Sequence, residues 1–237
     1  MVGPEESLMK PLTILVLGPG KTGSIVADVA RERGHQVEII DVDRNPEGAW
    51  LTPEHLRDVD VVIDFTTPEA VLKNVDRCVP AGKAMVVGTT GWYGEMDRVR
   101  SAVERAGTGF VFASNFSYGV NLFFQIVHAA APALTHGYSG AINEIHHVHK
   151  KDAPSGTAIS MLRILEQASG KRLPITSARE GEVPGIHILE LESAGDRVVL
   201  THDVKSRRTF AEGALLAAEW VVGKKGFYDF KDIFGQL

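Results

Sequence analysis

The chain has little of several things that would point to particular classes of protein. Its 237 residues include a single cysteine, Cys78, so an internal disulfide cannot form and a reducing compartment is expected. No stretch approaches the ~18 consecutive apolar residues that span a bilayer. The first residues include Glu5 and Glu6, and the apolar run after them ends at Leu17, so neither a signal peptide nor a membrane anchor is expected. We therefore predict a cytoplasmic protein.

Basic residues are in the minority, with 25 Lys and Arg against 30 Asp and Glu and a formal net charge of -5. Nucleic acids and anionic membranes favour basic surfaces, so neither is an expected partner. Hydrophobic residues make up 44% of the chain, which is enough to bury a sizeable core. The length fits one large α/β domain or two smaller ones.

Short apolar stretches alternate with amphipathic ones over the first half of the chain. Strands are expected at residues 12–17, 36–40, 61–65, 84–87 and 109–113, with helices at 21–33, from 66 to 79, and at 95–106 between them. Continuous apolar strands of this kind suit a parallel sheet that helices cover on both faces. We predict a doubly wound, Rossmann-type α/β domain.

A glycine-rich turn joins the first expected strand to the first expected helix. The G-x-G-x-x-G pattern is formed by Gly18, Gly20 and Gly23. Such glycines let the backbone approach a pyrophosphate, while an acid at the end of the next strand, here Asp41, accepts hydrogen bonds from the adenosine ribose. Asp41 favours NADH, whereas Lys21 and Arg44 offset its charge, so NADH and NADPH both remain candidate cofactors and Lys21 a candidate contact.

Polar and glycine-rich stretches follow the expected strands, at residues 18–23, 64–67, 88–91 and 114–117. They could simply form tight turns. However, the carboxyl ends of parallel strands lie at one edge of a sheet, and ligands bind there. We therefore expect one cofactor cleft, with the nicotinamide near the last two stretches.

The pattern changes after Phe116. A helix is expected at 119–134, a strand at 139–147, a helix from 155 to about 170, and an antiparallel hairpin at 186–192 and 197–202. This is an α+β pattern, whereas a last helix at 210–222 is expected to return to the first domain. We predict a dinucleotide-binding domain of residues 1–115 and 211–237, and a substrate-binding and oligomerisation domain of residues 116–210.

Residues 143–158 concentrate chemically active side chains. The basic ones are His146, His147, His149, Lys150 and Lys151. Ser155 is a favoured N-cap, so the N–H groups of Gly156 and Thr157 are expected among the unpaired donors of a helix start, which attracts carboxylates and phosphates. A proton donor, a cation and an anion-binding turn in one stretch indicate a substrate site.

Two other interpretations fit the same stretch. The histidines could bind a metal ion, but His146 and His147 would point to opposite faces of a strand and the lysines would repel a cation, so no metal is expected. The stretch could also be a solvated charged loop. Against this, it changes abruptly into a helix start made of small residues.

Residues 144–158, Glu-Ile-His-His-Val-His-Lys-Lys-Asp-Ala-Pro-Ser-Gly-Thr-Ala, closely resemble the central motif of the dihydrodipicolinate reductase family. Shorter motifs of that family recur in the same order at residues 63–66, 88–91, 115–121, 179–181, 184–185, 201–202 and 206–214. The resemblance implies NAD(P)H-dependent reduction of 4-hydroxy-tetrahydrodipicolinate (dihydrodipicolinate) to tetrahydrodipicolinate, in the diaminopimelate route to lysine. It also implies a homotetramer.

The resemblance implies roles for individual residues. His146 matches the proton donor and Lys150 its cationic partner, and the contacts to the substrate carboxylates match His147, Gly156 and Thr157. The dinucleotide contacts match Gly18, Gly20, Gly23, Asp41, Phe65, Gly88, Thr89, Thr90, Ser114, Asn115 and Phe116. The chain departs from the family in its first loop, which is one residue shorter and has Lys21 and Thr22 in place of an Arg-Met pair.

Two other functions remain open on these residues. An amino-acid dehydrogenase acting on an acyclic imine would use the helix start at Ser155 for a single carboxylate. A non-catalytic dinucleotide sensor would bind a regulatory anion at the His/Lys cluster.

Overall fold

The computed structural model describes residues 10–237, so Glu5 and Glu6, which entered the prediction about a signal peptide, lie outside the described residues. The chain forms two compact units. The first unit runs up to Phe116 and resumes at Phe210–Leu237, and the second unit is Ser117–Thr209. The boundaries predicted from the sequence fall after residue 115 and before residue 211. Within residues 10–237, no helix combines the length and the apolar character that a membrane crossing requires.

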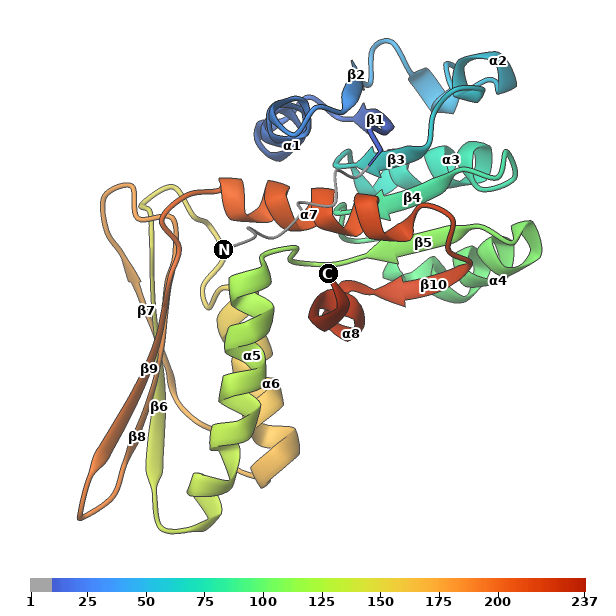
Figure 1. The fold of residues 1–237 in the computed structure, drawn as a ribbon. Helices are drawn as coiled ribbons and strands as arrows, with labels where there is room; N and C mark the ends of the chain where they lie inside the picture. Colours follow the sequence, from blue (N-terminus) through green and yellow to red (C-terminus); the bar gives the residue numbers. More distant parts are fainter. Residues whose placement is uncertain (1–9) are drawn as a thin grey trace, which may run out of the picture. The chain divides into compact units, whose positions relative to one another are not determined.

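The first unit is built on a parallel sheet, which has six strands in the described part of the chain, in the order β10-β5-β4-β3-β1-β2 (Figure 1). The strands are β1 (Thr13–Leu17), β2 (Gln36–Ile40), β3 (Val61–Asp64), β4 (Ala84–Val87), β5 (Gly109–Phe112) and β10 (Gly226–Asp229). The winding direction reverses between β1 and β3, and ligands bind at such a point in sheets of this kind.

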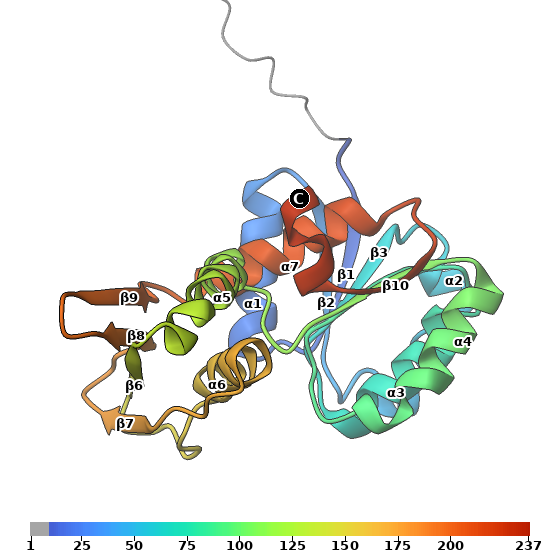
Figure 2. The ribbon, with the colours of Figure 1, turned by 90° about the horizontal axis from the view of Figure 1, so that it is seen from below.

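Helices cover both faces of this sheet (Figure 2). α1 (Lys21–Glu32) and α7 (Arg208–Val221) pack on one face, and α3 (Pro68–Cys78) and α4 (Met96–Ala106) pack on the other. Successive residues of β1 enter opposite cores, Ile14 with α1 and α7, and Leu15 with α3 and α4, because strand side chains alternate between faces. The predicted doubly wound Rossmann-type domain is confirmed.

Shorter elements complete the first unit. They are η1 (Pro46–Gly48), α2 (Pro53–Leu56), η2 (Tyr93–Glu95), α8 (Phe230–Ile233) and η4 (Phe234–Gln236). The helix expected at the end of the chain belongs to this unit, as predicted, since α7 contributes Ala214, Leu215 and Ala218 to its core.

Gly213 allows α7 to lie directly against the backbone at Phe116. A Cβ atom at position 213 would lie 1.7 Å from the carbonyl oxygen of Phe116. We expect Gly213→Ala to lower the free energy of unfolding by about 1–3 kcal/mol or more, the usual cost of overpacking. The check is a thermal melt beside Gly235→Ala, whose added methyl meets no described atom within 4 Å. Equal melting temperatures for the two variants would contradict this packing.

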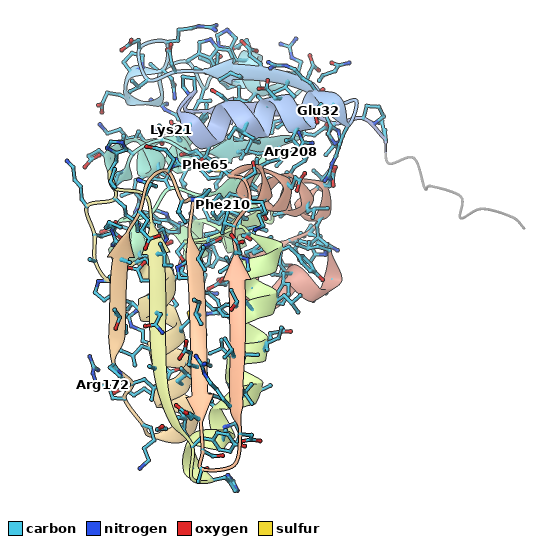
Figure 3. The ribbon with its side chains drawn as sticks, turned by 90° about the vertical axis from the view of Figure 1, so that its left-hand side faces the viewer. Lys21, Glu32, Phe65, Arg172, Arg208 and Phe210 are labelled. Atoms are coloured by element: carbon cyan, nitrogen blue, oxygen red, sulfur yellow. The ribbon has the colours of Figure 1, made fainter. Side chains whose placement is uncertain are left out.

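The second unit contains a mixed sheet, four-stranded within the described residues, in the order β7-β6-β8-β9. Its strands are β6 (Ser139–His146), β7 (Ile175–Arg179), β8 (Ile186–Glu192) and β9 (Arg197–Asp203). β8 and β9 form the predicted antiparallel hairpin, whereas β7 pairs in parallel with β6. α5 (Tyr118–Ala130), η3 (Ala131–Thr135) and α6 (Gly156–Ser169) share a core with one face of the sheet. Figure 3 looks onto the opposite face.

Some elements differ from the sequence-based expectation. The helix expected at 119–134 ends as α5 at Ala130 and continues as η3, because Pro132 cannot donate an α-helical hydrogen bond. β7 and β10 were not predicted. β7 is largely polar, and β10 is a four-residue stretch that begins with glycine, so neither carries a local strand pattern.

Candidate active site

The glycine turn lies between the end of β1 and the start of α1. Gly18 has a φ angle of 93°, and its N–H donates to the carbonyl of Ile40 at 2.9 Å. A Cβ atom at Gly18 would lie 2.5 Å from the carbonyl oxygen of Phe65, and one at Gly23 would lie 2.0 Å from the carbonyl oxygen of Gly18. Gly20 is exposed and has open space beside it. The turn is therefore tightly packed at Gly18 and Gly23 and open at Gly20, so a pyrophosphate could approach its backbone there.

Charged side chains flank this turn. Lys21 opens α1, is exposed, and lies with Phe65 at the same edge of the sheet (Figure 3). Asp41 directly follows β2, and its Oδ1 accepts the N–H of Arg44 at 2.8 Å. The Arg44 guanidinium lies 3.6 Å from Glu38. Both signs of charge thus occur near the end of β2, where an adenosine ribose is expected.

A cavity of about 220 Å³ lies along the ends of β3 and β4. Its lining residues are Phe65, Thr66, Pro68, Gly88, Thr89 and Thr90. The Phe65 ring rests on Gly88, where a Cβ atom would lie only 2.1 Å from Phe65 Cε1. Four predicted cofactor residues are thereby brought together in one hollow of the first unit.

Asp64, the last residue of β3, is fully buried and joins these turns. Its oxygens accept hydrogen bonds from the N–H and Oγ1 of Thr66 at 2.9 and 2.6 Å, from Thr89 Oγ1 at 2.9 Å and from Asn74 Nδ2 at 2.8 Å. Burial raises the pKa of Asp64, although these hydrogen bonds oppose the change. Asp64 was not predicted as a site residue, although an acid at the end of an apolar strand could have indicated one.

The remaining predicted cofactor residues follow β5. Ser114 is exposed and Asn115 is half-buried. Phe116 is buried in the core, with its ring 4.9 Å from Phe230 and 6.2 Å from Phe65. Its side chain is therefore a core element, and a contact with a cofactor would come from its backbone.

His146 ends β6, in the second unit. Ile142, Glu144 and His146 are all buried, as the two-residue period of a strand requires of side chains that share a face. The Nδ1 atom of His146 lies 2.5 Å from Oε2 of Glu144. Both atoms are enclosed, and neither makes an aligned hydrogen bond with any of residues 10–237, so what links them is their 2.5 Å approach to each other. The imidazole and the carboxylate therefore form a buried pair.

The surroundings set the charge of this pair. Burial lowers the pKa of His146, the cations of Lys150 and Arg179 add to this, and Glu144 opposes it. Burial alone would raise the pKa of Glu144, but hydrogen bonds from Ser177, Ser155 and Arg179 outweigh it and the pKa is lowered. Glu144 is therefore an anion at neutral pH, beside an imidazole whose pKa lies below its ordinary value.

Arg179 fixes the loop that carries Lys150. It donates to Oε1 of Glu144 at 3.1 Å and to the backbone carbonyls of Lys150 and Asp152 at 3.4 and 2.5 Å. Lys150 Nζ lies 2.8 Å from Asp152 Oδ1. His147 adjoins a further cation, because Nη2 of Arg207 lies 3.5 Å from its Nε2.

α6 begins as predicted. Ser155 is its N-cap, since its Oγ accepts the N–H of Ala158 at 3.2 Å. Gly156 and Thr157 occupy the first turn, where backbone N–H groups have no partner within the helix. The N–H of Ser155 donates to Glu144 at 3.3 Å, which ties the helix start to the end of β6. The predicted anion-binding turn and the predicted proton donor thus share one carboxylate.

Glu144, His146 and His187 bring possible metal-ligand atoms within 4.8 Å of one another. The 2.5 Å between Glu144 and His146 is a hydrogen-bonding distance, whereas two ligands of a tetrahedral zinc ion lie about 3.3 Å apart. Burial lowers the pKa of His187 to about 4, and its Nε2 lies 3.1 Å from Ser155 Oγ. His187 is therefore held by Ser155, while Glu144 and His146 lie closer together than two ligands of one zinc ion.

The predicted site residues fall into two groups, one in each unit. Those assigned to the substrate all belong to the second unit, and those assigned to the cofactor all belong to the first. Glu144, Arg179 and His187 were not predicted as parts of the site. Glu144 could have been found, because it stands two positions before His146 on a predicted strand and so faces the same side.

The first unit has the features of a dinucleotide site, namely a parallel sheet with a glycine turn and a cavity at its carboxyl edge. The second unit has the features of a substrate site, namely a buried acid–imidazole pair, a lysine and a capped helix start. Together they define a two-domain, dinucleotide-dependent oxidoreductase.

Comparison with known protein families identifies the family within this class. The family model described as "Dihydrodipicolinate reductase, N-terminus" matches residues 12–116, and the one described as "Dihydrodipicolinate reductase, C-terminus" matches residues 119–234. This chain belongs to the dihydrodipicolinate reductase family. The resemblance seen in the sequence motifs is confirmed.

Individual relatives agree. The 4-hydroxy-tetrahydrodipicolinate reductase of Christiangramia forsetii is 36% identical over 240 residues, which cover 95% of this chain and 99% of the relative. The enzyme of the same name from Neisseria meningitidis serogroup A is 42% identical over 197 residues, 74% of this chain and 72% of its own. A solved structure, a dipicolinate-bound dihydrodipicolinate reductase from Paenisporosarcina sp. TG-14, shares the fold with a TM-score of 0.79 at 23% identity, covering 94% of this chain and 100% of its own.

Proposed function

We propose that this protein catalyses the NAD(P)H-dependent reduction of 4-hydroxy-tetrahydrodipicolinate to tetrahydrodipicolinate, a step of diaminopimelate and lysine biosynthesis. The observation that carries the proposal is that the two family models together span residues 12–116 and 119–234, including every residue of the candidate site. The names of the relatives and the dicarboxylate bound by the structural neighbour support it.

In this proposal the second unit holds the two substrate carboxylates. Lys150 supplies a cation, and the N–H groups of Gly156 and Thr157 supply donors at the positive end of α6. His147 completes the set, with Arg207 beside it. A cyclic dicarboxylate needs fixed donors at two places, which an isolated helix start would not provide.

His146 acts as the proton donor. The bound NAD(P)H supplies a hydride to the conjugated ring of the substrate. The electrons displaced in the ring then require a proton, which an imidazole can deliver near neutral pH. The Lys150 cation favours the negative charge that develops in the substrate before the proton arrives.

The first unit holds the dinucleotide. Gly18, Gly20 and Gly23 would hold its phosphates, with Lys21 beside them, and Asp41 would accept hydrogen bonds from the adenosine ribose. The nicotinamide end is assigned to residues around the cavity and after β5: Phe65, Gly88, Thr89, Thr90, Ser114, Asn115 and Phe116.

Gly88 tests the assignment of the cavity. In Gly88→Ala the new methyl group would overlap the Phe65 ring, so this ring, which lines the cavity, must shift. We expect the dissociation constant of NADH or NADPH to rise about 10–100-fold, equivalent to the ~1–3 kcal/mol of an overpacked site. Calorimetric titration measures it, with Gly94→Ala as the control because its methyl meets no described atom within 4 Å. Unchanged affinity in Gly88→Ala would remove this cavity from the cofactor site.

We also propose a cytoplasmic homotetramer that assembles through the sheet of the second unit. The face opposite α5 and α6 carries partly exposed apolar side chains from three strands, at Ile145, Ile186, Ile188 and Val199. Apolar patches of this kind mark interfaces between proteins. Light scattering coupled to size-exclusion chromatography gives the mass in solution, and a monomer at micromolar concentration would contradict the assembly.

The reaction is tested by following absorbance at 340 nm with freshly prepared substrate and with NADH and NADPH in turn. Loss of absorbance that depends on the substrate supports the proposal. Turnover only with acyclic imino acids would instead indicate an amino-acid dehydrogenase. Cofactor binding without any consumption would indicate a sensor.

A further inference from the structure

Glu144 is an enclosed carboxylate that contacts three parts of the second unit. Its side chain has 0% exposure. Oε2 lies 2.5 Å from His146 Nδ1, while Oε1 accepts from Arg179 Nη1 at 3.1 Å and from the N–H of Ser155 at 3.3 Å. A buried carboxylate is stable only when paired and hydrogen-bonded in this way.

These contacts decide which nitrogen of His146 carries a fixed proton. An ionised carboxylate can only accept hydrogen bonds, so the Nδ1 atom facing it must be the donor. Oε1 faces donors, Arg179 and the N–H of Ser155, so the carboxylate stays ionised without taking a proton from the ring. The neutral imidazole is then the Nδ1–H tautomer, and Nε2 is the atom that gains and loses the proton.

On the other side of the His146 ring, no side chain of residue 185 covers Nε2. A Cβ atom at Gly185 would lie 2.9 Å from His146 Nε2, so only glycine leaves this nitrogen unobstructed. The His187 ring stands edge-on to His146, with centroids 5.0 Å apart, and its own Nε2 is 3.1 Å from Ser155 Oγ. Within the described part of the chain, the charged groups that act on the ring are Glu144, Lys150 from the loop after β6, and Arg179 from β7.

We propose that Glu144 is a positioning residue for the reduction: it holds a proton on Nδ1 of His146, so that Nε2 delivers the catalytic proton, and ties that ring to the amide donors that begin α6. Arg179 completes the arrangement by keeping Glu144 ionised. The assignment of His146 as donor rests on the proposed function, whereas the tautomer is a property of the free protein.

The tautomer is measured by long-range ¹H–¹⁵N spectra of the full chain labelled at histidine, with His146→Gln identifying the signals. In the unmodified protein we expect neutral His146 to be the Nδ1–H form. In Glu144→Gln, whose amide can donate as well as accept, this preference should be lost. Glu166→Gln, an exposed acid on α6, is the matched control and should leave the spectrum of His146 unchanged. An Nε2–H tautomer in the unmodified protein would overturn the proposal, even if Glu144→Gln failed to fold.

Kinetics give the second readout. Glu144→Gln should lower kcat about 10–100-fold, less than the loss expected for removing the donor itself, with the KM for the dinucleotide unchanged. The charged groups that still face His146 are Lys150 and Arg179, both of which lower its pKa, so the fall of kcat with rising pH should move to lower pH. An unshifted profile with wild-type kcat would overturn the role of Glu144. If the unmodified protein showed no turnover, the proposed function would fail, and the tautomer would still decide the role of Glu144.

Discussion

Replacing His146 with glutamine is expected to lower kcat by ~10²–10⁴-fold, the range typical of a lost general acid. Glutamine keeps hydrogen-bonding atoms and similar bulk but cannot deliver a proton. Cofactor affinity should change little, because His146 lies in the second unit and the predicted cofactor residues lie in the first. Steady-state rates at 340 nm give kcat, and calorimetry gives the dissociation constant of the dinucleotide.

A neighbouring histidine supplies the control for this variant. His149 is 74% exposed and pairs with Glu182 at 3.3 Å, so His149→Gln changes the same residue type in the same loop outside the buried pair. It should retain wild-type kcat. Unaltered turnover in His146→Gln would remove His146 from the mechanism.

The same role predicts a pH dependence. An acid catalyst works in its protonated form, so kcat should be highest at low pH and fall as the pH rises through the pKa of His146. Burial, Lys150 and Arg179 lower that pKa from the ordinary value of 6.5. The fall should therefore come at a lower pH than the ordinary pKa of histidine would give. A pH–kcat profile measured with saturating substrate checks the direction.

Replacing Lys150 with alanine is expected to lower kcat/KM about 10–100-fold, the equivalent of one charge-assisted hydrogen bond of ~1.5–3 kcal/mol. In the free protein Lys150 Nζ is paired with Asp152 at 2.8 Å, and its side chain is 22% exposed. It can exchange this carboxylate for one on the substrate. The variant also leaves Asp152 unpaired near the anion-binding turn, which adds repulsion toward a dicarboxylate.

Lys151 makes a stringent comparison, because it is the next residue and is exposed. Lys151→Ala removes the same charge from the same loop and should leave kcat/KM within about twofold of the wild type, since isolated surface charges contribute little. Both variants should melt at the wild-type temperature. An undiminished kcat/KM in Lys150→Ala would contradict its assignment as the catalytic cation.

Much of the fold could be predicted because its determinants are local. The apolar run of β1 followed by Gly18 and Gly20 predicted a strand, a turn and a helix start, and Ser155 predicted the cap of α6. Each of these depends on hydrogen bonds or on side-chain periodicity within a few residues. β7 and β10 were missed because their strand character comes from a partner, β6 or β5, and hardly from their own residues.

The sequence by itself determined the doubly wound sheet, the second α+β unit, the residue types of the site and the family, because these depend on short-range patterns and on motifs read in order. Only the tertiary structure decided which side chains of the site form hydrogen bonds and ion pairs with one another. Asp64 meets Thr89 because parallel strands end at one edge, and it meets Asn74 because α3 packs on the sheet. Arg179 meets Glu144, 35 residues earlier, because β7 lies beside β6 in a particular register. Such pairings cross between separate elements, where sequence distance carries no information about which side chains face each other, so the charge state of His146 could be argued only from the folded chain.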